Sequence, residues 1–479
     1  MENNRKNLRK IFKNFFSVCI GLTLILSAQS NAQVKSYTLD EAITTALENN
    51  HDTKIAKMNI QKASAAVDEA YGNALPSLDV SANLTHFMQK PMMFFPDFGA
   101  LLGNATYNIL FNENVLPRDN SKFAPIGLTK QSFALNNSFE TKVQLTQVLF
   151  NSAVLTGIGA SKIYQDVSKE QLKSTIAKTI LDVKKAFYGV LLTKSLSEIT
   201  SAGFANAQDN YKNVKAMFDQ GMVSEYDALQ ADVQVENFRP TVIMMENNYK
   251  NAKEGLKILM GIEPSSDFEI KGEFEYTDEA LPQESELVSK ALSDNLDLNT
   301  MNYKRQVDDA MINLYSADYW PSLAAFGNYS YAGSSDDFKF SNYSSSMVGV
   351  SLSLNLFKGM QTKAKVEQAK ISHDVSEEQY VQLKSFIILQ VKSKLLDVSS
   401  AKSKISTQDL NVKKAQMAYD ISKIRYQEGK GIQLEIQNNE IALRQAKMNR
   451  IQSIYEYIVS KAELDQLLGQ VEAKYFNSK

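Results

Sequence analysis

The sequence predicts a mainly α-helical fold with membrane β-strands, built from two tandem repeats. Three observations lead to this fold class. The two halves of the 479-residue chain resemble each other, residues 360–428 contain neither Gly nor Pro, and four short segments alternate between apolar and polar residues. The chain is too long for one ordinary domain, and a content of 44% apolar and 22% charged residues is typical of a folded protein.

Residues 1–32 have the features of a secretory signal peptide. A basic segment precedes an apolar stretch from Phe15 to Leu26, and small residues stand before the expected cleavage site at Gln33. The stretch is shorter than the ~20 residues that cross a bilayer as a helix, although an uncleaved anchor is the alternative interpretation. The only cysteine, Cys19, lies in this leader, so the mature chain is predicted to have no disulfide and no thiolate metal site.

Charge and composition argue against two functional classes. The leader holds five basic residues and one acidic residue, a charge of +4, and the whole chain carries −2, which leaves −6 for the mature chain. General nucleic-acid binding needs a basic surplus instead. The histidines His51, His86 and His373 are scattered without the spacing of metal ligands. We therefore expect no enzyme activity, no catalytic residue, no metal and no cofactor.

The chain repeats itself with an offset that changes once. Pro76–Leu78 recurs as Pro321–Leu323, 245 residues later, whereas Leu149-Phe150 recurs as Leu356-Phe357, 207 residues later. The difference of 38 residues indicates an insertion in the first half, between about His86 and Asn136. This insertion is rich in phenylalanine, and we expect it to cap or line a mouth, because it joins two strands on the side away from the helices.

Each repeat is predicted to contain a helix, two strands, a very long helix and a return helix. The stretch 360–428 would be about 100 Å long as one helix, at 1.5 Å per residue, which is wider than a single globular domain. The first repeat, 33–261, has a helix at 39–74, strands at about 77–86 and 137–150, a long helix at 152–220 and a return helix at 222–261. The second, 286–469, has a helix at 286–319, strands at about 322–332 and 346–357, a long helix at 360–428 and a return helix at 430–469, with a linker at 262–285 and a tail at 470–479.

The four predicted strands each have one apolar face and one polar face. A soluble antiparallel sheet packed on a core has the same pattern. The export signal, the segment length of ~10 residues and the scarcity of Lys and Glu on the polar faces favour strands that face lipid. The candidate lipid-facing residues are Leu78, Val80, Leu84, Val143, Leu145, Val348, Val350, Leu352 and Leu354.

Four strands are too few to close a barrel around water, because barrel diameter grows with the number of strands. Four strands from each of three subunits would give twelve, an even number within the range of bacterial outer-membrane barrels. The sequence therefore predicts an outer-membrane β-barrel that several copies of the chain share, and a trimeric barrel of twelve strands meets this requirement.

The ordered set of motifs resembles the TolC-like outer-membrane efflux family and covers nearly the whole mature chain. The pieces that carry this resemblance are Leu39–Ala42, Ala46–Asn50, the two Pro-Ser-Leu and two Leu-Phe motifs, Phe218–Gly221 and Tyr426–Gly429. The resemblance implies a homotrimer in the outer membrane of a Gram-negative bacterium. Its β-barrel would continue into a long periplasmic α-helical barrel that docks to a periplasmic adaptor (membrane-fusion) protein and an inner-membrane transporter.

The same resemblance places the periplasmic entrance at the turns between the long helices and the return helices. The candidate gate residues are Asp227, Glu435 and Tyr426, together with Asn438, where the family pattern would have a further acid. The candidate turn and adaptor-contact residues are Gly221, Gly429, Met222, Val223, Lys430 and Gly431. An alternative for Asp227 is a capping box with Ser224, which stabilises a helix start whether or not the carboxylate gates anything.

The expected function is the exit duct of a tripartite efflux pump that passively conducts small molecules such as drugs to the exterior. Two alternatives stay open at this point. A type I secretion conduit for polypeptides would have the same tube, because the transporter selects the cargo. A soluble exported coiled-coil scaffold would use the alternating segments as a small sheet.

Overall fold

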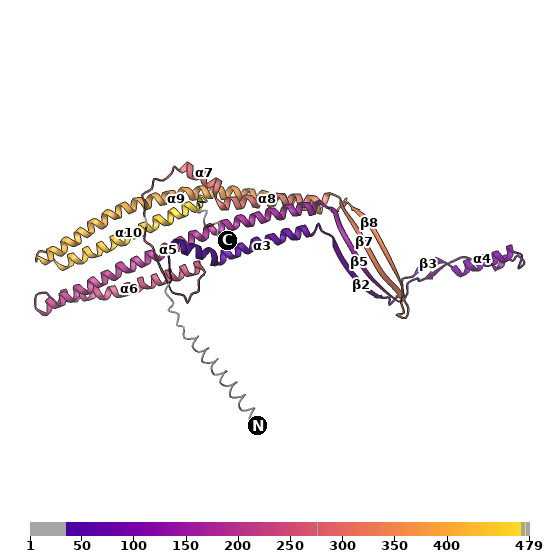
Figure 1. The fold of residues 1–479 in the computed structure, drawn as a ribbon, viewed down its shortest axis with the longest axis horizontal. Helices are drawn as coiled ribbons and strands as arrows, with labels where there is room; N and C mark the ends of the chain where they lie inside the picture. The colour runs from indigo at the N-terminus through magenta and orange to yellow at the C-terminus, as the bar shows by residue number, and fades with distance from the viewer. Residues whose placement is uncertain (1–34, 275, 471–474, 476–479) are drawn as a thin grey trace, which may run out of the picture. The chain divides into compact units, whose positions relative to one another are not determined.

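A computed structural model describes residues 35–274, 276–470 and Tyr475 (Figure 1). The predicted signal peptide, 1–32, and most of the predicted tail, 470–479, lie outside the described residues. The chain forms two compact units. The helical unit contains the described residues within 35–62, 165–305 and 375–475, and the sheet unit contains Ala63–Tyr164 and Gln306–Asp374.

Corresponding elements follow one another in the two halves of the chain. The first half has α2 (Leu39–Asn49), α3 (His51–Gly72), β2 (Ser77–His86), β5 (Asn137–Phe150), α5 (Ser152–Asp219) and α6 (Glu225–Met260). The second half has α7 (Glu284–Asp294), α8 (Leu296–Ser316), β7 (Ser322–Ser335), β8 (Ser341–Ser353), α9 (Gln361–Gln427) and α10 (Gln433–Leu467). Short elements outside the insertion are β1 (Lys35–Tyr37), which pairs in parallel with β6 (Phe268–Ile270), and the 3₁₀ turn η2 (Ala317–Tyr319).

The sheet unit is built on one antiparallel sheet with the strand order β2-β5-β7-β8 (Figure 1). Residues that lie directly opposite each other in an antiparallel pair share a face of the sheet. Leu78 pairs with Leu145, and Val80 pairs with Val143. Leu145 in turn lies opposite Gly327, which lies opposite Val348. The register thus gathers apolar residues from three of the strands on one face.

The last strand is shifted relative to the sequence prediction of 346–357. β8 begins five residues earlier and ends at Ser353, so Leu354 and the following Leu-Phe motif lie outside it. Ser353 pairs with Ser322, the first residue of β7. Pro321 precedes that residue and has no amide hydrogen to donate, so the ladder stops there. The assignment of Leu354 to a strand was wrong.

The insertion after β2 is a folded substructure. It contains β3 (Met93–Pro96), α4 (Phe98–Asn112), the 3₁₀ turn η1 (Asn120–Lys122) and β4 (Leu128–Gln131), with β3 and β4 paired antiparallel. Aromatic rings pack inside it, with centroids of Phe95 and Phe133 4.7 Å apart and those of Phe111 and Phe123 5.8 Å apart. Because His86 and Asn137 are paired at one end of the sheet, the insertion leaves from the end opposite to that joined by α3 and α5.

The helices predicted at 39–74 and 286–319 are each broken near their start, at Asn50 and Asn295. Asn50 Oδ1 accepts hydrogen bonds from the amides of Asp52 and Thr53, at 2.8 and 3.3 Å, and so caps α3. Its Nδ2 donates to the carbonyl of Leu259 at 2.9 Å. Asn295 makes the corresponding bonds to the amides of Asp297 and Leu298 and to the carbonyl of Leu467. The side chain takes over the bonds that a continuous helix would make.

Among the described residues, the two larger hydrophobic cores of the helical unit each belong to one repeat. In the first, Ile43 and Leu47 of α2 pack with Val183 and Phe187 of α5 and with Met260 of α6. The second core is formed mainly by the corresponding helices of the second repeat. Its buried residues include Leu287 and Ala291 of α7, Val391 and Val398 of α9, and Ile454 and Leu467 of α10.

Candidate functional site

The turn between α5 and α6 is closed by the backbone around Gly221. The amide of Gly221 donates to the carbonyl of Phe218 at 2.8 Å, and the amide of Met222 donates to that of Met217 at 2.9 Å. This is the Schellman arrangement, and it needs a left-handed residue at the glycine position. Gly221 has φ 74°, which glycine adopts without steric cost.

The turn between α9 and α10 repeats this geometry around Gly429, which has φ 69°. The amide of Gly429 donates to Tyr426 at 3.0 Å, and that of Lys430 donates to Arg425 at 2.8 Å. A Cβ atom on Gly431 would lie 3.1 Å from the backbone nitrogen of Tyr426. The turn is therefore tight enough to favour a second glycine two residues after the first.

Both return helices start three residues later than predicted, at Glu225 and Gln433 instead of 222 and 430. The residues before them, Ser224 and Ile432, are extended, with ψ of 155° and 152°. A chain that leaves a Schellman turn must pass through such an extended residue before a new helix begins. The candidate contact residues Met222, Val223, Lys430 and Gly431 consequently lie in the turns themselves.

Asp227 belongs to a capping box, which confirms the capping interpretation. Ser224 Oγ accepts a hydrogen bond from the Asp227 amide at 3.2 Å, and the Asp227 carboxylate accepts from the Ser224 amide at 3.2 Å. The Ser224 hydroxyl also donates to that carboxylate at 2.6 Å. The carboxylate is held at the positive end of α6, where the helix dipole favours a negative charge.

Glu435, at the corresponding place in α10, has a different environment. Ile432 cannot cap with its side chain, and no side-chain cap forms. Glu435 instead lies 3.7 Å from Nη1 of Arg425, on the last turn of α9. Arg425 Nη2 also donates to the carbonyl of Lys430 at 3.2 Å. The sequence prediction missed Arg425, although a basic residue in the last turn of a helix is a recognisable signal.

Tyr426 and Gln433 join the two hairpins near their turns. The Tyr426 hydroxyl approaches Sδ of Met217, on α5, at 3.8 Å. Gln433 Nε2 donates to Oδ1 of Asn210, also on α5. The structure thus brings the second turn against the long helix of the first repeat, through residues that the prediction, apart from Tyr426, did not select.

A groove of about 520 Å³ lies between α6 and α10, farther from the turns. The exposed Asn438 lines it, together with Phe238 and Arg444. The Arg444 guanidinium lies 4.3 Å from the centroid of the Phe238 ring, a cation–π arrangement. A Cβ on Gly203 would lie 3.0 Å from Arg444 Nη1, so the absence of a side chain there makes room for this pair.

A partly buried carboxyl group accompanies this arginine. Burial raises the pKa of Glu440, against the opposing effects of a hydrogen bond from Asn206 and the charge of Arg444. Burial likewise lowers the pKa of Arg444, although the charge of Glu440 opposes the shift. The low polarity at this junction of α5, α6 and α10 therefore disfavours both charged forms.

Neither a metal site nor a membrane-spanning helix is present in the part of the chain that the structure describes. No three His, Cys, Asp or Glu side chains of residues 35–274, 276–470 and 475 gather as metal ligands. Across the same residues, no helix has an apolar run long enough to cross a bilayer.

Comparison with known proteins decides the family. The sequence profile of the outer membrane efflux protein family matches residues 93–262 and 287–470, which is more than half of the chain and covers a large part of each repeat. The chain belongs to the outer membrane efflux protein family. Membership places it in the outer membrane as a channel-forming efflux protein and not an enzyme, so the alternative of a soluble scaffold is discarded.

Curated relatives and solved structures agree with this membership. The chain is 22% identical to the outer membrane protein TolC of Vibrio cholerae, over 68% of this chain and 76% of the relative, and 22% identical to TolC of Escherichia coli K12, over 70% of each. The Campylobacter jejuni CmeC outer membrane channel has the same fold, with a TM-score of 0.72 at 17% identity over 92% of this chain and 88% of that one. CusC gives a TM-score of 0.69 at 17% identity, covering 93% and 96% of the two chains.

Proposed function

We propose that this outer membrane efflux protein is the exit duct of a tripartite pump. Three copies form a channel that passively conducts small molecules, received from an inner-membrane transporter and a periplasmic adaptor, to the exterior. The observation that carries the proposal is the four-stranded sheet, which has one apolar face and, in the order β2-β5-β7-β8, a strand with a single neighbour at each edge.

The two sheet edges support a shared barrel. β2 and β8 each present one row of backbone groups without a strand partner within the sheet. In lipid, every backbone group needs a partner, and only a closed sheet provides one for each strand. Pairing β2 of one copy with β8 of the next would close twelve strands in a threefold assembly, which is wide enough for a channel.

Small-molecule efflux ducts and polypeptide secretion conduits differ in the cargo that they conduct. One relative, 21% identical over 70% of each chain, is the alkaline protease secretion protein AprF of Pseudomonas aeruginosa. Its name keeps polypeptide secretion as the second candidate. Small-molecule efflux is favoured because the family profile that matches both repeats describes efflux proteins.

Cell fractionation and a gene deletion test the proposal together. We expect the protein in the outer membrane fraction as a detergent-stable trimer, and we expect its deletion to raise susceptibility to small toxic compounds. Unchanged susceptibility together with loss of a secreted polypeptide would transfer the assignment to secretion. A monomer, or a soluble protein, would contradict the duct itself.

We further propose that Asp227 and Glu435 narrow a cation-favouring entrance. Both acids lie six residues after a turn glycine, so they occupy equivalent positions in the two repeats. Three copies with two such acids each would place six carboxylates around one axis, where they would favour cations. The double variant Asp227→Asn, Glu435→Gln should raise the concentration of a trivalent cation that half-blocks the channel about tenfold, equivalent to about 1.4 kcal/mol of binding. Single-channel conductance in planar bilayers measures this block.

The matched control removes the same number of charges from the same two turns. Glu225 and Glu428 are exposed, and Glu428 pairs with Lys430 at 3.0 Å. The variant Glu225→Gln, Glu428→Gln should leave the block nearly unchanged. Equal weakening in both double variants would show a general charge effect and would remove Asp227 and Glu435 from the gate.

A further inference from the structure

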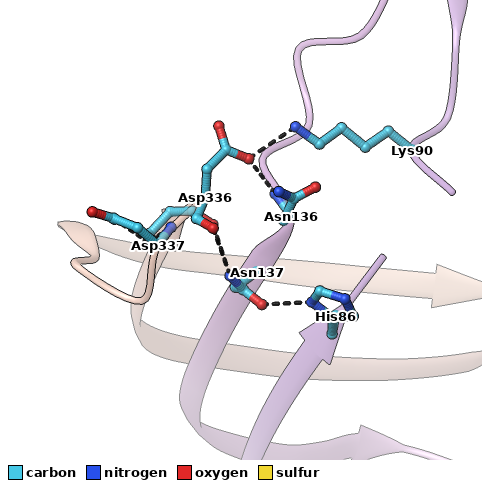
Figure 2. Close-up of polar contacts among 7 residues, drawn as sticks. His86, Lys90, Asn136, Asn137, Asp336 and Asp337 are labelled. Carbon is cyan, nitrogen blue, oxygen red and sulfur yellow. Dashed lines mark hydrogen bonds and ion pairs between the residues drawn. The ribbon is translucent and has the colours of Figure 1, made fainter. Parts of the chain in front are cut away.

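The insertion between β2 and β5 is fastened to the turn between β7 and β8 by polar contacts (Figure 2). His86 Nδ1 and Asn137 Oδ1 are 2.7 Å apart, and Asn137 Nδ2 donates to the carbonyl of Ser335 at 3.2 Å. The Asp336 carboxylate accepts from the Asn136 amide and pairs with Lys90, both at 2.8 Å. Both ends of the insertion are therefore tied to the same turn, which fixes where it leaves the sheet.

Within the insertion, one face of α4 is already occupied. Phe111 is buried and stacks against Tyr107 with a centroid distance of 5.9 Å. Asn104 exchanges two hydrogen bonds with the backbone of Ala124, each of 2.8 Å. These contacts hold α4 on the following loop through Phe123 and Ala124, so the rotation of the helix about its axis is set.

The opposite face of α4 is apolar and exposed. Phe98, Leu102, Ala105 and Ile109 follow one another at intervals of four, three and four residues. The exposed fractions of Phe98, Leu102 and Ile109 are 44%, 67% and 62%, and Ala105 is exposed as well. We call these four residues the α4 stripe. Intervals of three and four residues place side chains on one face of a helix, and such an apolar face packs against another element, for example a second helix.

The composition of α4 narrows the choice of partner. A helix that lies on a lipid surface usually has a basic polar face, whereas α4 contains no charged residue at all. A second helix with the same spacing is the complement that such a seam fits. In a threefold assembly each subunit contributes one α4, so each α4 has two identical neighbours. The insertion that contains α4 follows β2, and β2 is an edge strand, which in the proposed barrel lies next to the adjacent subunit.

We propose that the α4 stripes of three subunits pack against one another as a short three-helix bundle at the end of the sheet. The inference rests on the proposed trimer. A free helix of 15 residues is marginally stable in water and would not assemble alone. Attachment to a common barrel raises the effective concentration of the three helices into the range in which a short seam associates.

Cysteine cross-linking in the intact trimer tests this bundle. Cys19, the one cysteine of the sequence, lies in the predicted signal peptide, so a cysteine introduced by Ala105→Cys is the only thiol of the mature protein. A short bismaleimide should join two Ala105→Cys chains, and denaturing gels should show at least fivefold more covalent dimer than for the control Thr106→Cys. Thr106 is exposed on the same helix and points about 100° away from Ala105.

The oligomeric state of each sample separates the two proposals. A purified trimer with cross-linking specific to Ala105→Cys supports the bundle. A trimer in which both cysteines react with a monofunctional maleimide but neither cross-links overturns the bundle and leaves the proposed duct intact. A trimer in which Ala105→Cys is protected from labelling after reconstitution into liposomes, but not before, has the same consequence, because lipid then covers the stripe. A monomer overturns both proposals.

Discussion

Replacing Gly261 with alanine is expected to destabilise the helical unit by about 2–5 kcal/mol. Gly261 ends α6 with φ 63°, a left-handed conformation that costs a residue with a Cβ atom about 1–2 kcal/mol. An added Cβ would also lie 2.5 Å from the backbone oxygen of Asn49. Backbone cannot move away as a flexible side chain could, so the joint between α6 and α2 must open. Loss of helical circular dichroism on heating or in urea measures the change.

Gly221→Ala is the matched control for this prediction. Gly221 has a similar φ, 74°, but apart from its chain neighbours no atom of the described residues lies within 4 Å of an added Cβ. It should therefore lose only the conformational part, about 1–2 kcal/mol. Equal shifts of the unfolding midpoint in the two variants would mean that the contact with Asn49 relaxes at no cost.

Val350→Arg is expected to reduce the yield of assembled protein in the outer membrane, because it places a charge on the apolar face of the sheet. Val350 is 65% exposed in the single chain and lies opposite Ala325. If this face contacts lipid near the middle of the bilayer, as we propose, arginine there costs about 2–4 kcal/mol. The measurement is the amount of heat-modifiable trimer in outer membrane fractions.

Ser351→Arg provides the comparison, since it changes the next residue of β8 and therefore points to the other face. Ser351 is also exposed and would line the water-filled side of the proposed barrel. Its trimer yield should remain close to that of the unchanged protein. Normal yield for Val350→Arg, or an equal loss for both variants, would show that the apolar face does not contact lipid.

Much of the fold could be predicted because its signals are local. Pro76 and Pro321 precede strands whose alternation is visible, and the long helices lack residues that would end them. The breaks at Asn50 and Asn295 could not be predicted in this way. Each depends on a carbonyl far along the chain, that of Leu259 or Leu467, which accepts a hydrogen bond from the asparagine Nδ2 and so helps to hold the capping side chain in place. An asparagine within an apolar helical pattern does not by itself indicate such a partner.

At the candidate site, too, local features could be predicted from the sequence and long-range contacts could not. The capping box of Ser224 and Asp227 lies within four consecutive residues and could be recognised in the sequence. The sequence before α10 has no such signal, because Ile432 offers no capping side chain. The contacts of Tyr426 with Met217 and of Gln433 with Asn210 link residues more than 200 positions apart. Only the packing of one hairpin against the other creates them.

The asparagine joint between two helices occurs twice in this protein, once in each repeat. Asn50 and Asn295 perform the same three hydrogen-bonding tasks 245 residues apart, and the glycines that follow α6 and α10 abut the residues just before them, Asn49 and Asp294. The two repeats have the same geometry at this joint, although the side chains around it differ. Each repeat therefore serves as the reference state for a mutation made in the other, within one molecule and one preparation.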